Sequence, residues 1–294
     1  MRRTFRISTA LLRRIVTSLY FLFFFNGFLL ALVFYCYTED QYEKQIFGSL
    51  SNYVYDKLRN NTYSDREVLI ESLHLTHELE ANRQRIFSHE EIAGWKAEYF
   101  RPVSYDLMTA QGACGSYSYV LGRLLKNMNY TVRFVQMKSG DVYGAHNLIE
   151  AKMGSQWVVL DPLYNLYFTK PDGNLASFKD VQNNWDYYKT QLPAGYDMTY
   201  HYEDARYTNW QKVPVLMPAL KKVLNWTIGK EKADQVSLRS FVLRKYNFFK
   251  LIFLTIFAMV SSFTVFKFFR YNRKVFALVL SHKTVLKSPK IKVA

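Results

Sequence analysis

Three residue types that together can cleave or transfer an acyl group occur in order along this sequence: Cys114, His146 and Asp161. Cys114 lies in Gly-Ala-Cys-Gly-Ser-Tyr at 112–117, and its flanking glycines leave room for the close approach of a substrate carbonyl. A thiol attacks a carbonyl carbon as the thiolate, which a helix N-terminus and a neighbouring imidazolium both favour. The order of the three residues therefore predicts a nucleophilic site.

The cysteine must be carried by a helix that begins at the cysteine itself. Apolar side chains recur after it at helical spacing, at Tyr117, Val120, Leu121, Leu124 and Leu125. The sequence therefore predicts an amphipathic helix with Cys114 in its first turn.

The histidine and the aspartate are expected on the two strands of a hairpin. The β-like runs 142–152 and 155–162 flank Met153-Gly154, which suits a two-residue turn. If Lys152 pairs with Ser155, His146 faces Asp161, and directly opposed Cβ atoms lie only about 4.5–5.5 Å apart. Strand alternation places one set of residues on the histidine face, namely His146, Leu148, Glu150, Trp157, Val159 and Asp161, and a second set on the other, namely Asn147, Ile149, Val158 and Leu160.

Residues 112–162 resemble the transglutaminase-like (papain-like) superfamily. The likeness is carried by Gly-x-Cys at the start of a helix, by Tyr-Thr-Val-Arg at 130–133, by His-Asn-Leu-Ile-Glu at 146–150 and by Trp-Val-Val-Leu-Asp-Pro at 157–162. The chain departs from the family pattern at Asn147-Leu148, where members commonly carry a small residue and a Trp, and at Asn129, where they usually carry Gly. The resemblance implies an α+β fold with the cysteine helix packed on an antiparallel sheet.

The resemblance also implies a role for each residue. Cys114 is the expected nucleophile, His146 the general base and then acid, and Asp161 the group that orients the imidazole. The backbone N–H of Cys114 is a candidate oxyanion donor, and Gln111 is a weaker one. Members of the superfamily act on amides as peptidases, transglutaminases or glycoprotein amidases, and others bind without catalysis. We expect a peptide, protein or glycoconjugate amide as substrate, with no cofactor and no metal.

Each residue also has an ordinary explanation. A lone Cys is usually a small buried apolar group, and a strand His is often a core polar residue. A zinc site from Cys114, His146 and Asp161 lacks the close ligand pairs typical of such sites. His74 and His77 lie one helical turn apart, an arrangement that can bind a metal but more often is a solvated helix face.

Two apolar segments predict membrane spans. Residues 15–37 are interrupted only by Thr17, Ser18 and Asn26, and about 20 apolar residues cross a bilayer. A second span is expected over 247–269. For Asn26, an amide within the first span, we expect a helix–helix or water contact rather than a role in transport.

The charge distribution predicts the orientation of the spans. The net charge of +15 comes from 39 Lys and Arg against 24 Asp and Glu, and all the acidic residues lie between Glu39 and Asp234. The region between the spans is therefore nearly neutral, and the positive excess lies at both membrane flanks. This pattern places both termini in the cytoplasm, and it argues against nucleic acid as a partner.

We therefore expect a basic cytoplasmic N-terminus (1–14), a span (15–37), a helical extension (38–100), an exported transglutaminase-like domain with aromatic loops (101–246), a second span (247–269) and a basic cytoplasmic tail (270–294). The aromatic residues of 163–207 either pack on their own domain or line a cleft. Residues 213–229 suggest an amphipathic segment near the membrane. The expected setting is a bacterial plasma (inner) membrane with the domain in the periplasm or outside the cell. The alternative to an enzyme is a non-catalytic binding or assembly subunit that works with envelope-assembly proteins.

Overall fold

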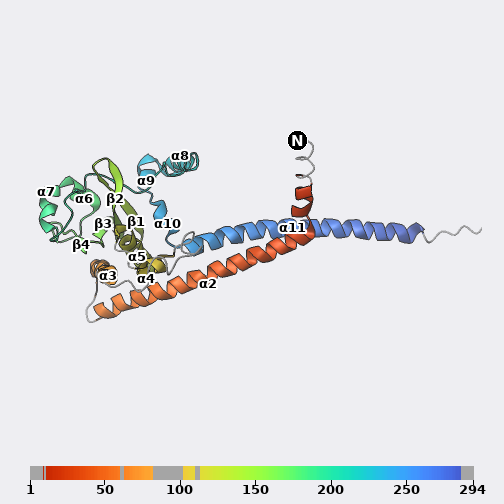
Figure 1. Cartoon of the computed structure of the whole chain (residues 1–294), viewed down its shortest axis with the longest axis horizontal. Helices are drawn as coiled ribbons and strands as arrows, with labels where there is room; N and C mark the ends of the chain where they lie inside the picture. Colours follow the sequence, from red (N-terminus) through yellow and green to blue (C-terminus); the bar gives the residue numbers. More distant parts are fainter. Residues whose placement is uncertain (1–8, 10, 60–62, 82–101, 110–112, 286–294) are drawn as a thin grey trace, which may run out of the picture. The chain divides into compact units, whose positions relative to one another are not determined.

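The chain has an α+β fold with one antiparallel sheet, as the sequence predicted. The structure, a computed structural model, describes residues 9, 11–59, 63–81, 102–109 and 113–285 (Figure 1). It divides into two compact units, one made of residues 1–39 with 246–294 and the other of residues 40–245.

Both predicted apolar segments form helices that are long and apolar enough to cross a membrane. They are α2 (Leu19–Leu58) and α11 (Lys245–Val285). In their most apolar stretches only 17% and 6% of the residues are buried, whereas a core helix of a soluble protein is mostly buried. Their side chains are therefore available to lipid.

Both helices extend beyond the predicted spans. Residues 11–16 are helical, and a turn at Thr17 and Ser18 separates them from α2, which then continues through the predicted boundary at residue 37. The second helix likewise continues past residue 269. The end of an apolar run does not end a helix, because polar residues with high helix propensity continue it.

Asn26 joins the two apolar helices of the first unit. Its Nδ2 donates to Oγ1 of Thr264 at 3.0 Å, and its Oδ1 accepts from Oγ of Ser261 at 2.6 Å. The helix–helix contact expected of this amide is confirmed.

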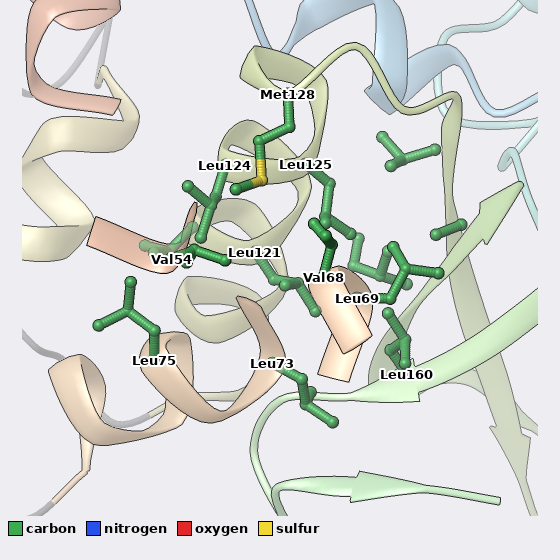
Figure 2. Packing of buried hydrophobic residues seen from close by; sticks show 14 of the residues in the cluster. Val54, Val68, Leu69, Leu73, Leu75, Leu121, Leu124, Leu125, Met128 and Leu160 are labelled. Atoms are coloured by element: carbon green, nitrogen blue, oxygen red, sulfur yellow. The ribbon is translucent and has the colours of Figure 1, made fainter. Parts of the chain in front are cut away.

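The helical layer of the second unit packs around α5 (Cys114–Asn127). All five apolar residues predicted for its buried face are buried. Around it lie the part of α2 after Asp40, α3 (Asp65–Glu80) and α4 (Val103–Thr109). Figure 2 shows the resulting core, in which Leu121, Leu124 and Leu125 of α5 meet side chains of α2, α3 and the sheet.

Five strands form the sheet in the order β4-β3-β2-β1-β5. They are β1 (Val132–Ser139), β2 (Val142–Met153), β3 (Gln156–Asp161), β4 (Leu166–Tyr167) and β5 (Ala205–Arg206). One face of the sheet, with Ile149, Val158 and Leu160, packs on the helical layer. The other face, with Leu148 and Val159, packs on an aromatic layer. The predicted alternation of β2 and β3 is therefore confirmed.

The predicted register of the hairpin is wrong by two residues: each residue of β2 pairs with a residue of β3 two positions further along the chain than predicted. Met153 pairs with Gln156 and Lys152 with Trp157, so the loop is Gly154-Ser155. Gly154 has φ +59°, and both favoured two-residue hairpin turns need a positive φ at their first loop position. With the glycine at that position, the cross-strand partner of Asp161 changes by two residues, and Asp161 does not lie directly opposite His146.

The aromatic layer consists of 166–207, which includes α6 (Phe178–Asn183), α7 (Trp185–Tyr188) and η2 (Lys189–Gln191). Tyr188, Tyr196 and Tyr202 are buried in it. These three buried tyrosines pack on their own domain rather than line a cleft, which were the two roles considered from the sequence. Three short helices follow: α8 (Leu216–Ile228), α9 (Lys230–Asp234) and α10 (Leu238–Val242).

Candidate active site

Cys114 is the first residue of α5, as its place in the sequence predicted. Its side chain is half-buried, and it is a free thiol. Nδ2 of Asn147, on the face of β2 toward α5, donates a hydrogen bond to its Sγ at 3.3 Å. The sulfur therefore has both a helix N-terminus and a directed donor beside it, and both favour the thiolate.

His146 and Asp161 form a buried pair. Nε2 of His146 lies 2.7 Å from Oδ2 of Asp161, and both side chains are at most 1% exposed. They meet diagonally across β2 and β3 rather than as directly opposed residues, because a two-residue offset keeps both on one face within reach of long side chains. The predicted contact is therefore made through a different register.

The turn after β3 fixes the carboxylate. Oδ1 of Asp161 accepts hydrogen bonds from the backbone N–H groups of Leu163 and Tyr164 at 3.2 and 3.4 Å. Its other oxygen is thereby left for the imidazole. The Asp-Pro at the end of the strand is thus part of a turn that aims the acid.

A β-bulge adjoins the histidine. The pairing of β1 with β2 shifts between Met137 and Lys138, next to the pair Met137 and His146. Gly144, two residues before the histidine, has φ +92°, which glycine adopts without strain. Bulges of this kind change the direction of nearby side chains, so this one contributes to the placement of the imidazole.

Aromatic rings surround the imidazole. Tyr200 stacks on His146 with ring centroids 4.6 Å apart and planes within 11°, and Tyr164 meets it edge to face at 5.8 Å. Nδ1 of His146 has no standard hydrogen bond within the described residues. Because Nε2 is hydrogen-bonded to Asp161, Nδ1 is the imidazole nitrogen that is available to interact with the thiol.

The thiol and the imidazole change each other's pKa. Burial alone would raise the pKa of Cys114, but the neighbouring His146 and the hydrogen bond from Asn147 outweigh it, so this pKa lies below its usual value. Burial would also lower the pKa of His146, yet the Asp161 carboxylate and the thiol raise it to about 9. Both shifts favour a thiolate–imidazolium pair at neutral pH.

Two polar partners hold Asn147 in place. Nη1 of Arg239, in α10, donates to its Oδ1 at 2.9 Å, and Oγ of Ser118, in α5, donates to its backbone oxygen at 2.9 Å. An amide whose oxygen accepts from Arg239 must present its NH₂ group to the sulfur. Sequence reasoning placed Asn147 on the correct face without giving it a role, and it missed Arg239, which lies far along the chain.

Other residues considered from the sequence have separate positions. Gln111 lies outside the described residues. His74 binds Oδ1 of Asn165 at 2.7 Å and His77 binds the Pro162 oxygen at 3.1 Å, so both hold α3 to the turn after β3. Within the part of the chain that the structure describes, no cluster of three or more His, Cys, Asp or Glu side chains is placed to hold a metal ion.

No family model, no curated protein and no solved structure matches the chain. What the site can do therefore follows from its own geometry.

Proposed function

We propose that the chain is a membrane-anchored thiol enzyme of transglutaminase-like type that acts on amide bonds, with Cys114 as nucleophile, His146 as acid and base and Asp161 as orienting group. The observation that carries the proposal is the buried 2.7 Å contact of His146 with Asp161, which leaves the second imidazole nitrogen for a thiol whose pKa it lowers. A buried structural cysteine would have a raised pKa instead.

In the first half of the reaction the Cys114 thiolate attacks the carbonyl carbon of an amide. The carbonyl π electrons move to the oxygen, where the first turn of α5 supplies a partial positive charge. The C–N bond then breaks, and the imidazolium of His146 gives its proton to the departing amine. The product is an acyl thioester on Cys114 with a neutral imidazole beside it.

In the second half a water molecule or an amine attacks the thioester while His146 takes its proton. The C–S bond breaks, the acyl product leaves, and the thiolate–imidazolium pair is restored. Water gives hydrolysis, and an amine gives acyl transfer. Asp161 keeps its charge throughout and stabilises the imidazolium each time it forms.

Asn147 has a supporting part in this mechanism. Its Nδ2–H is directed at the sulfur and so stabilises the thiolate before attack and after deacylation. Arg239 fixes the amide in the orientation that this requires.

We further propose that α2 and α11 span the plasma membrane with both termini in the cytoplasm and the site outside. The length and apolar surface of the two helices support the spans, and the positive residues outside them support the orientation. Substrates would then be amides of peptides, proteins or glycoconjugates at the outer face.

Acylation of the purified full-length protein with p-nitrophenyl acetate tests the chemistry without a known substrate. We expect a burst of p-nitrophenol and an acetyl group on Cys114 in the intact-mass spectrum. Cys114→Ser should abolish both, and His146→Ala should slow acetylation by about a hundredfold or more, because general acid–base catalysis contributes about 10²–10⁴-fold.

Cys36→Ala is the matched control, because Cys36 is the second free thiol and is buried. It should leave the burst unchanged. If His146→Ala were acetylated as fast as the wild type, Cys114 would be an ordinary thiol, and a binding or assembly subunit would become the better account.

A further inference from the structure

The helix α8 (Leu216–Ile228) exposes apolar side chains that the proposed chemistry does not use. Trp226 is 87% exposed, Leu216 65% and Val223 55%, and none of the residues of α8 is buried. Side chains at positions 216, 219, 220, 223 and 226 recur at helical spacing and so lie on one face. Soluble proteins rarely expose an apolar face of this kind without a use for it.

The side of α8 opposite this face contacts the protein, and its partly buried residues are Met217, Lys221, Leu224 and Asn225. Nζ of Lys221 lies 2.8 Å from Oδ1 of Asp234 and 5.9 Å from the centre of the Trp210 ring. Lys221 and Asn225, one turn apart, are both partly buried. An ordinary surface helix turns its apolar side chains toward the protein, whereas Leu216, Val223 and Trp226 of α8 point away from it. The arrangement therefore presents the apolar face outward.

Lysines occur within α8 and on both sides of it in the sequence. Lys212, Lys222, Lys230 and Lys232 are all exposed, and α8 itself contains no acidic residue. Anionic headgroups attract such side chains, and an exposed tryptophan suits the boundary between headgroups and acyl chains. The pattern of an apolar face with basic flanks is that of a helix lying in a membrane interface.

We propose that α8 lies flat in the interface of an anionic lipid surface, with Leu216, Val223 and Trp226 at the level of the upper acyl chains and the flanking lysines among the headgroups. The occupant of this face is thus lipid rather than a second protein. The inference rests on the proposed membrane spans, which tether α8 to a bilayer through the same chain, but it does not depend on the thiol chemistry.

Site-directed spin labelling of the full chain in phosphatidylcholine–phosphatidylglycerol vesicles tests this placement. A nitroxide is attached to Val223→Cys in a Cys36→Ala, Cys114→Ser background. Its collision rates with oxygen, which concentrates in lipid, and with a water-soluble nickel chelate are then measured. We expect high oxygen and low chelate accessibility at residue 223.

Two matched labels calibrate the result. Phe263→Cys in α11 should give the same lipid profile, and Asn183→Cys, exposed on α6, should be open to the chelate. High chelate accessibility at residue 223 would place it in water, and low accessibility to both reagents would place it against protein; either result overturns the inference.

The Phe263 label separates this inference from the proposed spans. A lipid profile at residue 263 without one at residue 223 would overturn only the placement of α8. Loss of the lipid profile at both positions would overturn the membrane anchoring as well.

Discussion

At the residue scale, the reactivity of Cys114 depends on how well its neighbours are held. The sulfur accepts from Nδ2 of Asn147 at 3.3 Å; Arg239 of α10 holds that side-chain amide, and Ser118 of α5 holds the backbone oxygen of the same residue. The imidazole is fixed in the same way, by Asp161 on one edge and by the Tyr200 ring on its face. The proposed nucleophile thus lies among groups that do not need to reorganise when charge develops.

Removing the Asn147 donor should make Cys114 a weaker acid. A hydrogen bond to a charged group is worth about 1.5–3 kcal/mol, so Asn147→Ala should raise the thiol pKa. The pH dependence of iodoacetamide alkylation measures this shift. Asn183→Ala, an exposed asparagine on α6, is the control and should leave the profile unchanged. An unshifted profile in Asn147→Ala would mean that this amide does not act on the sulfur.

The residues of the candidate site were easier to predict from the sequence than the hydrogen bonds between their side chains. Cys114, His146 and Asp161 could be found because their types, order and element ends carry local signals. Arg239 could not, because its contact with Asn147 joins residues 92 positions apart and depends on where α10 packs. Asn147 did carry a signal, since it adjoins the histidine and lies on the face toward the cysteine helix.

At the element scale, α5 is held between the sheet and the end of α2. Gly122 lets the helix approach the sheet, since a Cβ there would lie 3.2 Å from side-chain atoms of Ile149 and Phe134. On the opposite side, the fully buried Arg123 lies 3.8 Å from Glu43 of α2 and over the ring of Phe47. This ion pair links the cysteine helix to the helix that continues from the first apolar segment.

Removing one charge of the buried pair should be costly. Glu43→Gln leaves Arg123 charged and buried, and breaking such a pair typically lowers the free energy of unfolding by about 3–5 kcal/mol. The double variant Glu43→Leu, Arg123→Met should restore most of the loss, because it removes both members of the pair. Urea unfolding of the detergent-solubilised protein compares the two. Equal losses in both variants would show that shape rather than charge governs this contact.

Element types were predictable from hydrophobic periodicity, whereas the hairpin register was not. The alternation of apolar residues fixed which faces of β2 and β3 are buried, but it is unchanged by a two-residue slip. The observed register follows from Gly154, because a two-residue hairpin turn needs a positive φ at its first loop position and Gly154 has one. Alternation therefore found the correct face for His146 and Asp161 but paired them with the wrong partners.

At the scale of the whole molecule, charge separates the ends of the chain from its middle. The acidic residues all lie between Glu39 and Asp234, while both ends are basic. Such a distribution orients spans in a membrane because positive flanks are retained in the cytoplasm. The nearly neutral middle holds Cys114, His146 and Asp161, so the proposed chemistry and the proposed anchoring belong to different parts of the chain.

A reporter fused after Ala294 should be active only if it functions in the cytoplasm, because the proposed topology places this end inside. A fluorescent protein that folds only in the cytoplasm and a phosphatase that is active only after export form a matched pair of fusions. We expect fluorescence from the first and no activity from the second. An active phosphatase would reverse the orientation and place the thiol site in the cytoplasm.

The central claim is that His146 activates Cys114, and the pH dependence of alkylation tests it most directly. In the wild type, Cys114 should become a thiolate below the usual thiol pKa of about 8.5, because the imidazolium stabilises it. That imidazolium persists up to about pH 9, so the pair is present throughout the neutral range. In His146→Ala burial, Asn147 and the helix N-terminus remain but the imidazolium is lost, and the alkylation midpoint should rise toward or above the usual value. The same midpoint in both proteins, at or above the usual thiol pKa, would contradict the account.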